Sequence, residues 1–147
     1  MLDPSTIFGL GGNLAMLGWL ALLIALFFKP ARQYAFPAAQ FVIPAILAVG
    51  YVLLIWQGRA GFEQGGFGSI EAVRTLFAND AALTAGWLHY LAFDLFIGAW
   101  ISRDAAARGI SPLIVLPCLP LTFLLGPAGL LLYLAARTAL PARESAQ

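Results

Sequence analysis

The sequence has few of the side chains on which soluble folds and metal sites depend. Only 10% of its 147 residues are charged, against about 25% in an average soluble domain. Its one cysteine, Cys118, excludes an intramolecular disulfide, and its one histidine, His89, is too few for a di-iron centre or a bis-histidine haem. The formal net charge of +1 comes with no basic stripe. We therefore expect no metal, no cofactor and no nucleic-acid partner.

Long apolar runs are what the sequence has instead. Charged residues bound four stretches of 25, 26, 22 and 28 residues, and only one of these stretches contains a charge, Asp94. About 20 apolar residues cross a bilayer as a helix. The pattern predicts an all-α fold, a single transmembrane domain (1–147) built as a four-helix bundle. The expected spans cover about 7–28, 36–56, 81–101 and 112–135.

The connection between the second and third spans predicts a short interfacial helix over about 69–79. Ser69 is a suitable helix cap, and apolar residues follow it at helical spacing, including Ile70, Leu76 and Phe77. Two interpretations stay open for this segment. It is either an amphipathic spacer or a lid over an entrance that faces the membrane.

The third span carries the residues best suited to chemistry. Asp94 lies near its middle, where an ionised carboxylate costs about 2.5–3.5 kcal/mol, so the side chain should face protein and stay neutral unless a cation reaches it. Trp87 and Tyr90 share its face, whereas His89 is about 140° away around the helix, on the stripe of Phe93. Asp94 is either an internal hydrogen-bond anchor or a proton or ligand site. His89 is either a satisfied interior histidine or a general acid or base, and we expect both residues inside the bilayer and facing protein.

The fourth span is irregular near its centre. Pro127 cannot donate a hydrogen bond to the carbonyl of Phe123, and two glycines, of which Gly129 is one, loosen the same turn. Free backbone acceptors at this depth are tolerated only inside protein or along a cavity. We expect a break here, as a packing kink or as the wall of a site near Asp94. Thr122 is placed either to face that site or to bond a local carbonyl.

The first span contributes small residues and two candidate contacts. Gly11, Ala15 and Gly18 fall on one stripe, which allows another helix to approach closely. Trp19 lies in mid-span rather than at the membrane surface, so we expect it to pack inside the protein or against a ligand. Asn13 is the polar residue of this span that a ligand or Asp94 would meet.

These residues resemble a known family. The string Trp-Leu-His-Tyr-Leu-Ala-Phe-Asp-Leu-Phe at residues 87–96 and the later Pro-x-Gly of Pro127 and Gly129 are similar to the abscisic-acid-deficient-four family, the neoxanthin-synthase-like membrane proteins. The resemblance covers all four spans and the segment 69–79. Plant members are implicated in forming the allenic carotenoid neoxanthin from the epoxide violaxanthin.

The resemblance implies a membrane protein that binds a carotenoid or a related isoprenoid. Epoxide-to-allene rearrangement is redox-neutral, so an acid and a base suffice, and His89 and Asp94 would be the catalytic pair. The expected ligand-binding residues are Trp87, Tyr90, Phe93, Asn13, Trp19, Thr122, Pro127 and Gly129. The alternatives are a non-enzymatic carotenoid-binding or assembly subunit of a membrane complex, and a small proton-coupled transporter. The expected partners are a membrane lipid or carotenoid and either a second copy or a larger complex.

The charges also predict an orientation. Lys29, Arg32, Arg103 and Arg108 lie in two short connections, and this basic density favours a cytoplasmic location for both. An even number of spans then places both termini outside. Met1 leads almost at once into the first span, so we expect a bacterial inner-membrane protein with periplasmic termini.

Overall fold

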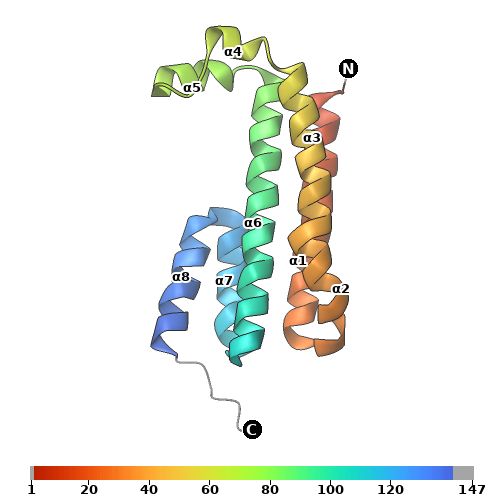
Figure 1. The fold of residues 1–147 in the computed structure, drawn as a ribbon, viewed down its shortest axis with the longest axis vertical. Helices are drawn as coiled ribbons and strands as arrows, with labels where there is room; N and C mark the ends of the chain where they lie inside the picture. Colours follow the sequence, from red (N-terminus) through yellow and green to blue (C-terminus); the bar gives the residue numbers. More distant parts are fainter. Residues whose placement is uncertain (1, 141–147) are drawn as a thin grey trace.

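The computed structural model describes residues 2–140, and all of their regular structure is helical. Three segments are long and apolar enough to cross a membrane: α1 (Pro4–Phe27), the composite segment Lys29–Gln57 and α6 (Asp80–Arg108). They run side by side (Figure 1). Three of the four predicted spans are therefore confirmed as candidate membrane crossings.

The second span consists of several helical pieces because it contains prolines. Pro37 and Pro44 lack the backbone N–H that a regular α-helix needs, and the backbone widens to a π-helical turn between them. The pieces are a 3₁₀ turn (Lys29–Ala31), α2 (Arg32–Pro37), the π-helical turn (Ala38–Val42) and α3 (Ile43–Gln57). The segment nevertheless continues in one direction as a single span.

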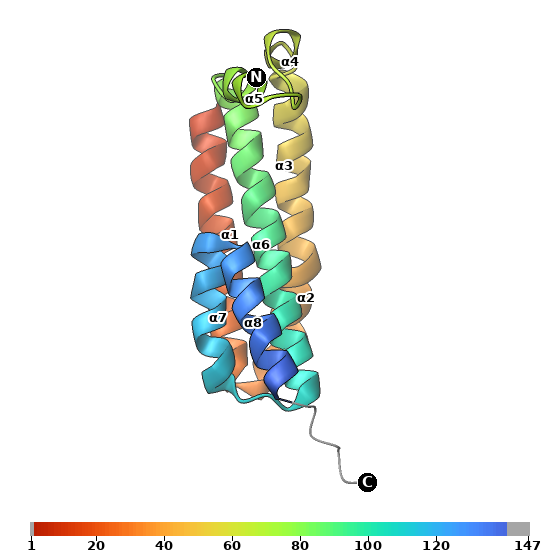
Figure 2. The same ribbon diagram turned by 90° about the vertical axis from the view of Figure 1, so that its left-hand side faces the viewer.

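The fourth predicted span is wrong, because the chain turns back halfway. α7 (Pro112–Leu125) and α8 (Pro127–Ala139) are antiparallel and pack together beside one half of α6 (Figures 1 and 2). Gly126 joins them with φ 28° and ψ −87°, a conformation that favours glycine, and Pro127 begins the next helix. The expected kink is thus a reversal, and the pair forms a helical hairpin with its tip at Gly126.

This reversal changes the expected orientation. The termini, residues 1 and 141–147, lie outside the described residues. Pro4 and Ala139, near the two ends of the described chain, lie at opposite ends of the long helices (Figure 1). The start of α1 and the end of α8 therefore lie at different ends, unlike the arrangement expected from four spans, and the location of the termini themselves stays a prediction. Three candidate crossings and a hairpin stand in place of the expected four-helix bundle.

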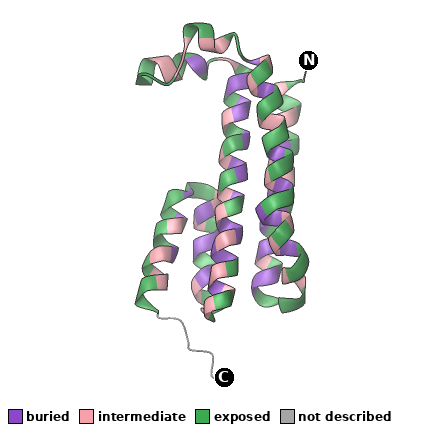
Figure 3. Cartoon of the chain, viewed as in Figure 1, coloured by how far each residue is buried: buried purple, intermediate pink, exposed green. Residues whose placement is uncertain are grey.

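The core runs along α6, which packs against α1 and α3 on one side and the hairpin on the other. Buried residues follow these contact lines, whereas the outward faces are exposed (Figure 3). The small-residue stripe of α1 acts as predicted: a Cβ on Gly11 would lie 2.3 Å from Leu88, and one on Gly18 would lie 2.6 Å from Leu95. Glycine therefore permits the close approach of α1 to α6.

The connection between α3 and α6 forms a short helical cap over one end of the bundle. It contains α4 (Gly61–Gln64) and α5 (Ile70–Leu76), the latter capped by Ser69, whose Oγ accepts from the amide of Ala72 at 3.1 Å. The predicted helix and its cap are confirmed. Its apolar face is only partly buried, since Leu76 is 1% exposed and Ile70 is 73% exposed.

Candidate functional site

The tip of the hairpin meets Asp94 at the centre of α6. Fourteen residues separate Asp94 from each end of that helix, at Asp80 and Arg108. The contact with the tip is close, because a Cβ on Gly126 would lie 2.6 Å from Asp94 Oδ1. Asp94 Oδ2 is buried and has no hydrogen-bond partner among the described residues. As predicted, Asp94 faces protein in mid-span, and its carboxyl group is left available.

The broken turn at the tip frees one carbonyl, and α6 supplies its donor. Pro127 has no N–H for the Phe123 carbonyl, and Tyr90 Oη donates to that oxygen at 2.9 Å. Thr122 Oγ1 donates to the Cys118 carbonyl at 2.7 Å, the local bond that the sequence left open as an alternative. Tyr90 therefore ties the tip to the turn of α6 that precedes Asp94.

Two of the predicted ligand-binding residues hold the hairpin together. Thr122 is fully buried, and a Cβ on Gly129 would lie 2.2 Å from its Oγ1. The absence of a side chain at Gly129 thus lets α8 rest directly on α7. The structure places both residues between the two helices rather than on an accessible surface.

Trp19 provides a second polar atom without a partner near the tip. Its ring is 4% exposed and packs edge-on against Phe123 of α7, with centroids 5.6 Å apart, and against Gly98 of α6. Trp19 Nε1 has no acceptor among residues 2–140. A buried donor on α1 and a buried acceptor on α6 therefore flank the last turn of α7, and unpaired groups of this kind are uncommon in proteins.

The half of α6 beyond the hairpin tip carries exposed aromatic side chains. Trp87 stacks on Tyr90 at 5.2 Å and on Phe8 of α1 at 5.3 Å, and Phe93 is 60% exposed. We call the surface formed by Trp87, Tyr90, Phe93 and Asp94 the open face. The hairpin covers only the other half of α6 (Figure 2), so it leaves the open face uncovered. The predicted stripe of Trp87, Tyr90 and Asp94 is confirmed.

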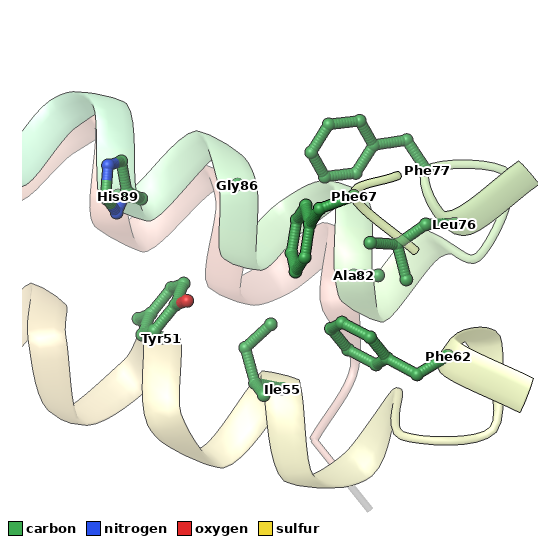
Figure 4. A pocket seen from close by; sticks show the side chains of 9 residues that line it. All are labelled: Tyr51, Ile55, Phe62, Phe67, Leu76, Phe77, Ala82, Gly86 and His89. Atoms are coloured by element: carbon green, nitrogen blue, oxygen red, sulfur yellow. The ribbon is translucent and has the colours of Figure 1, made fainter. Parts of the chain in front are cut away.

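His89 lies on a different side of α6. It is exposed, which corrects the expectation that protein encloses it, and its ring stacks on Phe93 at 4.5 Å and lies 5.9 Å from Tyr51 of α3. It borders a cavity of about 330 Å³ beneath the α4–α5 segment (Figure 4). The described structure contains no hydrogen bond between His89 and Asp94. The two residues are therefore not a directly coupled acid–base pair.

Comparison with known proteins identifies the family. A family model described as ABA DEFICIENT 4-like matches residues 6–133. The chain belongs to the ABA DEFICIENT 4-like family. No curated protein and no solved structure gives a significant match. The matched range includes the hairpin tip, the open face and the cavity beside His89, so these features lie in the part that this ABA DEFICIENT 4-like chain shares with its family.

The sequence did not predict one polar cluster of this ABA DEFICIENT 4-like protein. Asp104 Oδ2 accepts from Tyr133 Oη at 2.5 Å, from Arg108 Nε at 2.9 Å and from Arg137 Nε at 3.0 Å. Trp100 adds contacts to the same two α8 residues. The spacing of Asp104 and Arg108 signals an ion pair within one helix. The bonds from α8 could not be predicted, because Tyr133 and Arg137 reach Asp104 only when the chain reverses at the hairpin tip.

The remaining predicted residue, Asn13, is exposed on α1 and makes no side-chain hydrogen bond within the described chain. No group of three metal-ligating side chains occurs among the residues that were described. The arrangement as a whole offers one carboxyl oxygen without a partner, Asp94 Oδ2, one imidazole on a separate side of α6 and an aromatic surface. Such a set can bind a flat apolar molecule and exchange a proton with it.

Proposed function

We propose that this membrane protein of the ABA DEFICIENT 4-like family binds a carotenoid or a related isoprenoid on the open face of α6. The observation that carries the proposal is the juxtaposition of exposed aromatic rings with the unpartnered Asp94 Oδ2 at the hairpin tip. A soluble protein would hide such rings, whereas a membrane protein can present them to a ligand that arrives through the bilayer.

The dimensions of the open face suit an extended ligand. The stretch from Asp80 at the start of α6 to Asp94 rises by about 21 Å at 1.5 Å per residue. Trp87 and Phe93 offer their rings to a conjugated chain along this length, and the tip of the hairpin closes one end. An oxygen-bearing group at that end could donate to Asp94 or accept from it.

The chemistry that this geometry supports is a redox-neutral isomerisation. A neutral Asp94 carboxyl protonates an epoxide oxygen, the carbon–oxygen bond breaks, and loss of a vinylic proton to a base forms the new double bond. His89 is the candidate base. Because it lies on another side of α6, it would act on the ligand and not through Asp94. Substrate and product are isomers, so no external oxidant or reductant enters the balance.

Pigment analysis of the purified protein tests the proposal. The full chain, made in a carotenoid-producing host, should retain pigment after purification, and the retained amount should fall several-fold in Phe93→Ala. Phe27→Ala is the matched control, because Phe27 is 59% exposed, close to the 60% of Phe93, but lies at the far end of α1. Absence of any bound isoprenoid would contradict the proposal. Pigment that is bound but unchanged would favour a non-enzymatic binding subunit.

We also propose an orientation in the membrane. The reversal at Gly126 brings Arg137 to the end of the bundle that already holds Lys29, Arg32, Arg103 and Arg108, whereas Arg59 and Arg74 lie at the other end. Five of the seven described Lys and Arg residues thus share one end. The bias toward positive charge on the cytoplasmic side favours placing that end in the cytoplasm and the start of α1 outside.

A further inference from the structure

We propose that the cavity beneath the α4–α5 segment is a second binding site, which takes a compact oxygenated six-membered ring such as the cyclic end of an isoprenoid. We call this cavity the chamber. Its lining residues are Tyr51, Ile55, Phe62, Phe67, Leu76, Phe77, Ala82, Gly86 and His89. The choice of an isoprenoid ring rests on the function proposed above, whereas the existence of a ring-binding site does not.

The chamber has fixed walls and an aromatic cover. α3 and α6 form the walls, and the side chains of the α4–α5 segment close over them (Figure 4). Phe62 and Phe67 meet edge-on with centroids 5.7 Å apart, and buried Leu76 anchors the cover. A Cβ on Gly86 would lie 3.1 Å from the ring of Phe77, so glycine keeps space open on the α6 wall. These contacts favour the interpretation of the α4–α5 segment as a lid.

The size of the chamber limits its occupant. A volume of about 330 Å³ is at the low end of ligand pockets, about 300–1,000 Å³. At about 30 Å³ for each water-sized group, it holds roughly ten non-hydrogen atoms. A trimethylated six-membered ring with one oxygen has this size, whereas a whole long-chain isoprenoid does not fit. Among residues 2–140, no Lys or Arg lines the chamber, which disfavours a phosphate or other anion.

The polar groups of the chamber explain the preference for an oxygen on the ring. Tyr51 and His89 face each other across one end of the chamber (Figure 4), and their ring centroids are 5.9 Å apart. Neither side chain makes a hydrogen bond within the described part of the chain. A hydroxyl or keto oxygen between them would find a donor, and the hydroxyl would also find an acceptor.

The chamber connects to the open face through one aromatic stack. His89 stacks on Phe93, which belongs to the open face, with centroids 4.5 Å apart. Five residues separate His89 from Asp94, a rise of about 7.5 Å along α6. A ligand whose ring occupies the chamber can therefore pass His89 and extend its chain over Phe93 toward the hairpin tip.

Binding of a free ring tests the chamber. The probe is isophorone, a trimethylated cyclohexenone, titrated into the detergent-solubilised full chain and followed by saturation-transfer NMR. The hydrocarbon analogue, trimethylcyclohexene, is the comparison ligand. Saturable binding of isophorone is expected. His89→Leu should weaken its binding about 2- to 10-fold, the value of one hydrogen bond, and should leave the hydrocarbon unaffected. His89→Gln should restore part of the loss.

Two pairs of variants locate the site. Ile55→Trp fills the chamber and should weaken both ligands at least about tenfold, whereas Val52→Trp, on the lipid-facing side of α3, should not. Phe67→Ala removes part of the cover and should weaken binding several-fold without altering the walls. Ile70→Ala is its matched control, because Ile70 is 73% exposed and Phe67 74%. Equal binding by all four variants and the parent, or no saturable binding, would overturn the proposal.

The same experiment separates the chamber from the proposed function. Asp94→Asn, at the hairpin tip, should leave isophorone binding unchanged. Isophorone binding that Ile55→Trp abolishes, in a protein that retains no carotenoid, would support the chamber and overturn only the proposed function. Retained carotenoid without a ring site would overturn the chamber alone.

Discussion

The hairpin meets one aspartate of α6 at its tip and another at its base, and the hydrogen bonding of these two side chains differs. At the base, Asp104 accepts hydrogen bonds from Tyr133, Arg108 and Arg137, two of which come from α8. At the tip, ten residues earlier on α6, Asp94 Oδ2 is buried and has no partner in the described chain. Three side chains converge on Asp104 Oδ2 and hold the hairpin against α6, whereas Asp94 Oδ2 receives no hydrogen bond.

The difference in hydrogen-bond partners is the opposite of what the cost of an ionised carboxylate at each position would favour. A carboxylate is most costly at the middle of a membrane-spanning helix and least costly near its ends. Asp94 lies at the middle of α6, a candidate span, and Asp104 lies near its end. Selection for stability alone would supply partners to Asp94 first. The unpartnered Asp94 Oδ2 at the tip therefore supports the proposal that this residue meets a ligand or exchanges a proton.

Labelling of engineered cysteines tests the hairpin and gives an all-or-none result. Ser5→Cys and Thr138→Cys place thiols on exposed residues near the start of α1 and the end of α8. A membrane-impermeant maleimide should label them from opposite sides of the membrane, with Ser5→Cys reacting in intact cells. Cys118 is buried, so the parent protein should remain unlabelled. Labelling of both positions from one side would mean that the last segment crosses the membrane.

Loss of the acid at the tip should have the largest effect on activity. Asp94→Asn keeps the shape and a hydrogen-bonding group but cannot transfer a proton, so carotenoid conversion should fall about 100-fold or more while pigment remains bound. Pigment conversion and retention in a carotenoid-producing host are measured together. Asp80→Asn, in the first turn of α6, is the control and should convert normally. Normal conversion by Asp94→Asn would eliminate the acid role.

Loss of the acid at the base should instead reduce stability. Asp104→Ala removes the acceptor of three side chains and leaves Arg137 and Tyr133 of α8 without their partner. Because Tyr133 is buried but the charged groups are partly exposed, we expect a loss of about 2–3 kcal/mol in the free energy of unfolding. Thermal unfolding in micelles measures it, and faster proteolysis within α8 should accompany it. An unchanged unfolding temperature would show that the network does not hold the hairpin.

The sequence predicted much of this arrangement from local patterns. The charge spacing predicted three of the spans, and the Gly-Pro pair at 126–127 predicted the break, the freed Phe123 carbonyl and its closeness to Asp94. The reversal could not be predicted, because an uncharged run of 28 residues is also long enough for a full membrane crossing. In addition, the sequence around Gly126 does not indicate whether its φ is positive or negative. The position of His89 beside the chamber depended on where α4 and α5 fold, which their short amphipathic sequence does not specify.

The tip itself can be perturbed without changing a charge. Gly126→Ala places a Cβ at a positive φ and 2.6 Å from Asp94 Oδ1, so we expect it to lower stability by about 1–2 kcal/mol and to disturb conversion. Gly12→Ala is the matched control, since a Cβ there meets nothing within 4 Å and alanine favours an ordinary helix. Chemical denaturation in mixed micelles compares the two. Equal stability of both variants would argue against a tightly packed tip.

A third aspartate, exposed Asp3, should give the smallest effect and a pH dependence of known sign. Its Oδ2 accepts from the Thr6 hydroxyl at 2.5 Å, the Ser5 hydroxyl at 2.7 Å and the Thr6 amide at 2.9 Å. These bonds, the Thr6 hydroxyl first, lower the pKa of Asp3 from 3.8 to about 2. A pKa lowered by folding stabilises the folded form above the unfolded pKa, and this contribution is lost as the pH falls through the folded pKa.

The first turn of α1 should therefore keep its hydrogen-exchange protection from neutral pH down to about pH 4 and lose it toward pH 2. The largest change is expected at the Thr6 amide, which Asp3 caps. Asp3→Asn retains an acceptor but cannot ionise, so it should remove the pH dependence while leaving much of the protection at neutral pH. Protection that declines already between pH 6 and pH 4 would contradict the lowered pKa. Asp3 caps the first turn of α1 and touches neither end of the hairpin, so the variant should leave pigment conversion unchanged. This result would separate a local helix cap from Asp104, which holds α8, and from Asp94, which contacts the hairpin tip.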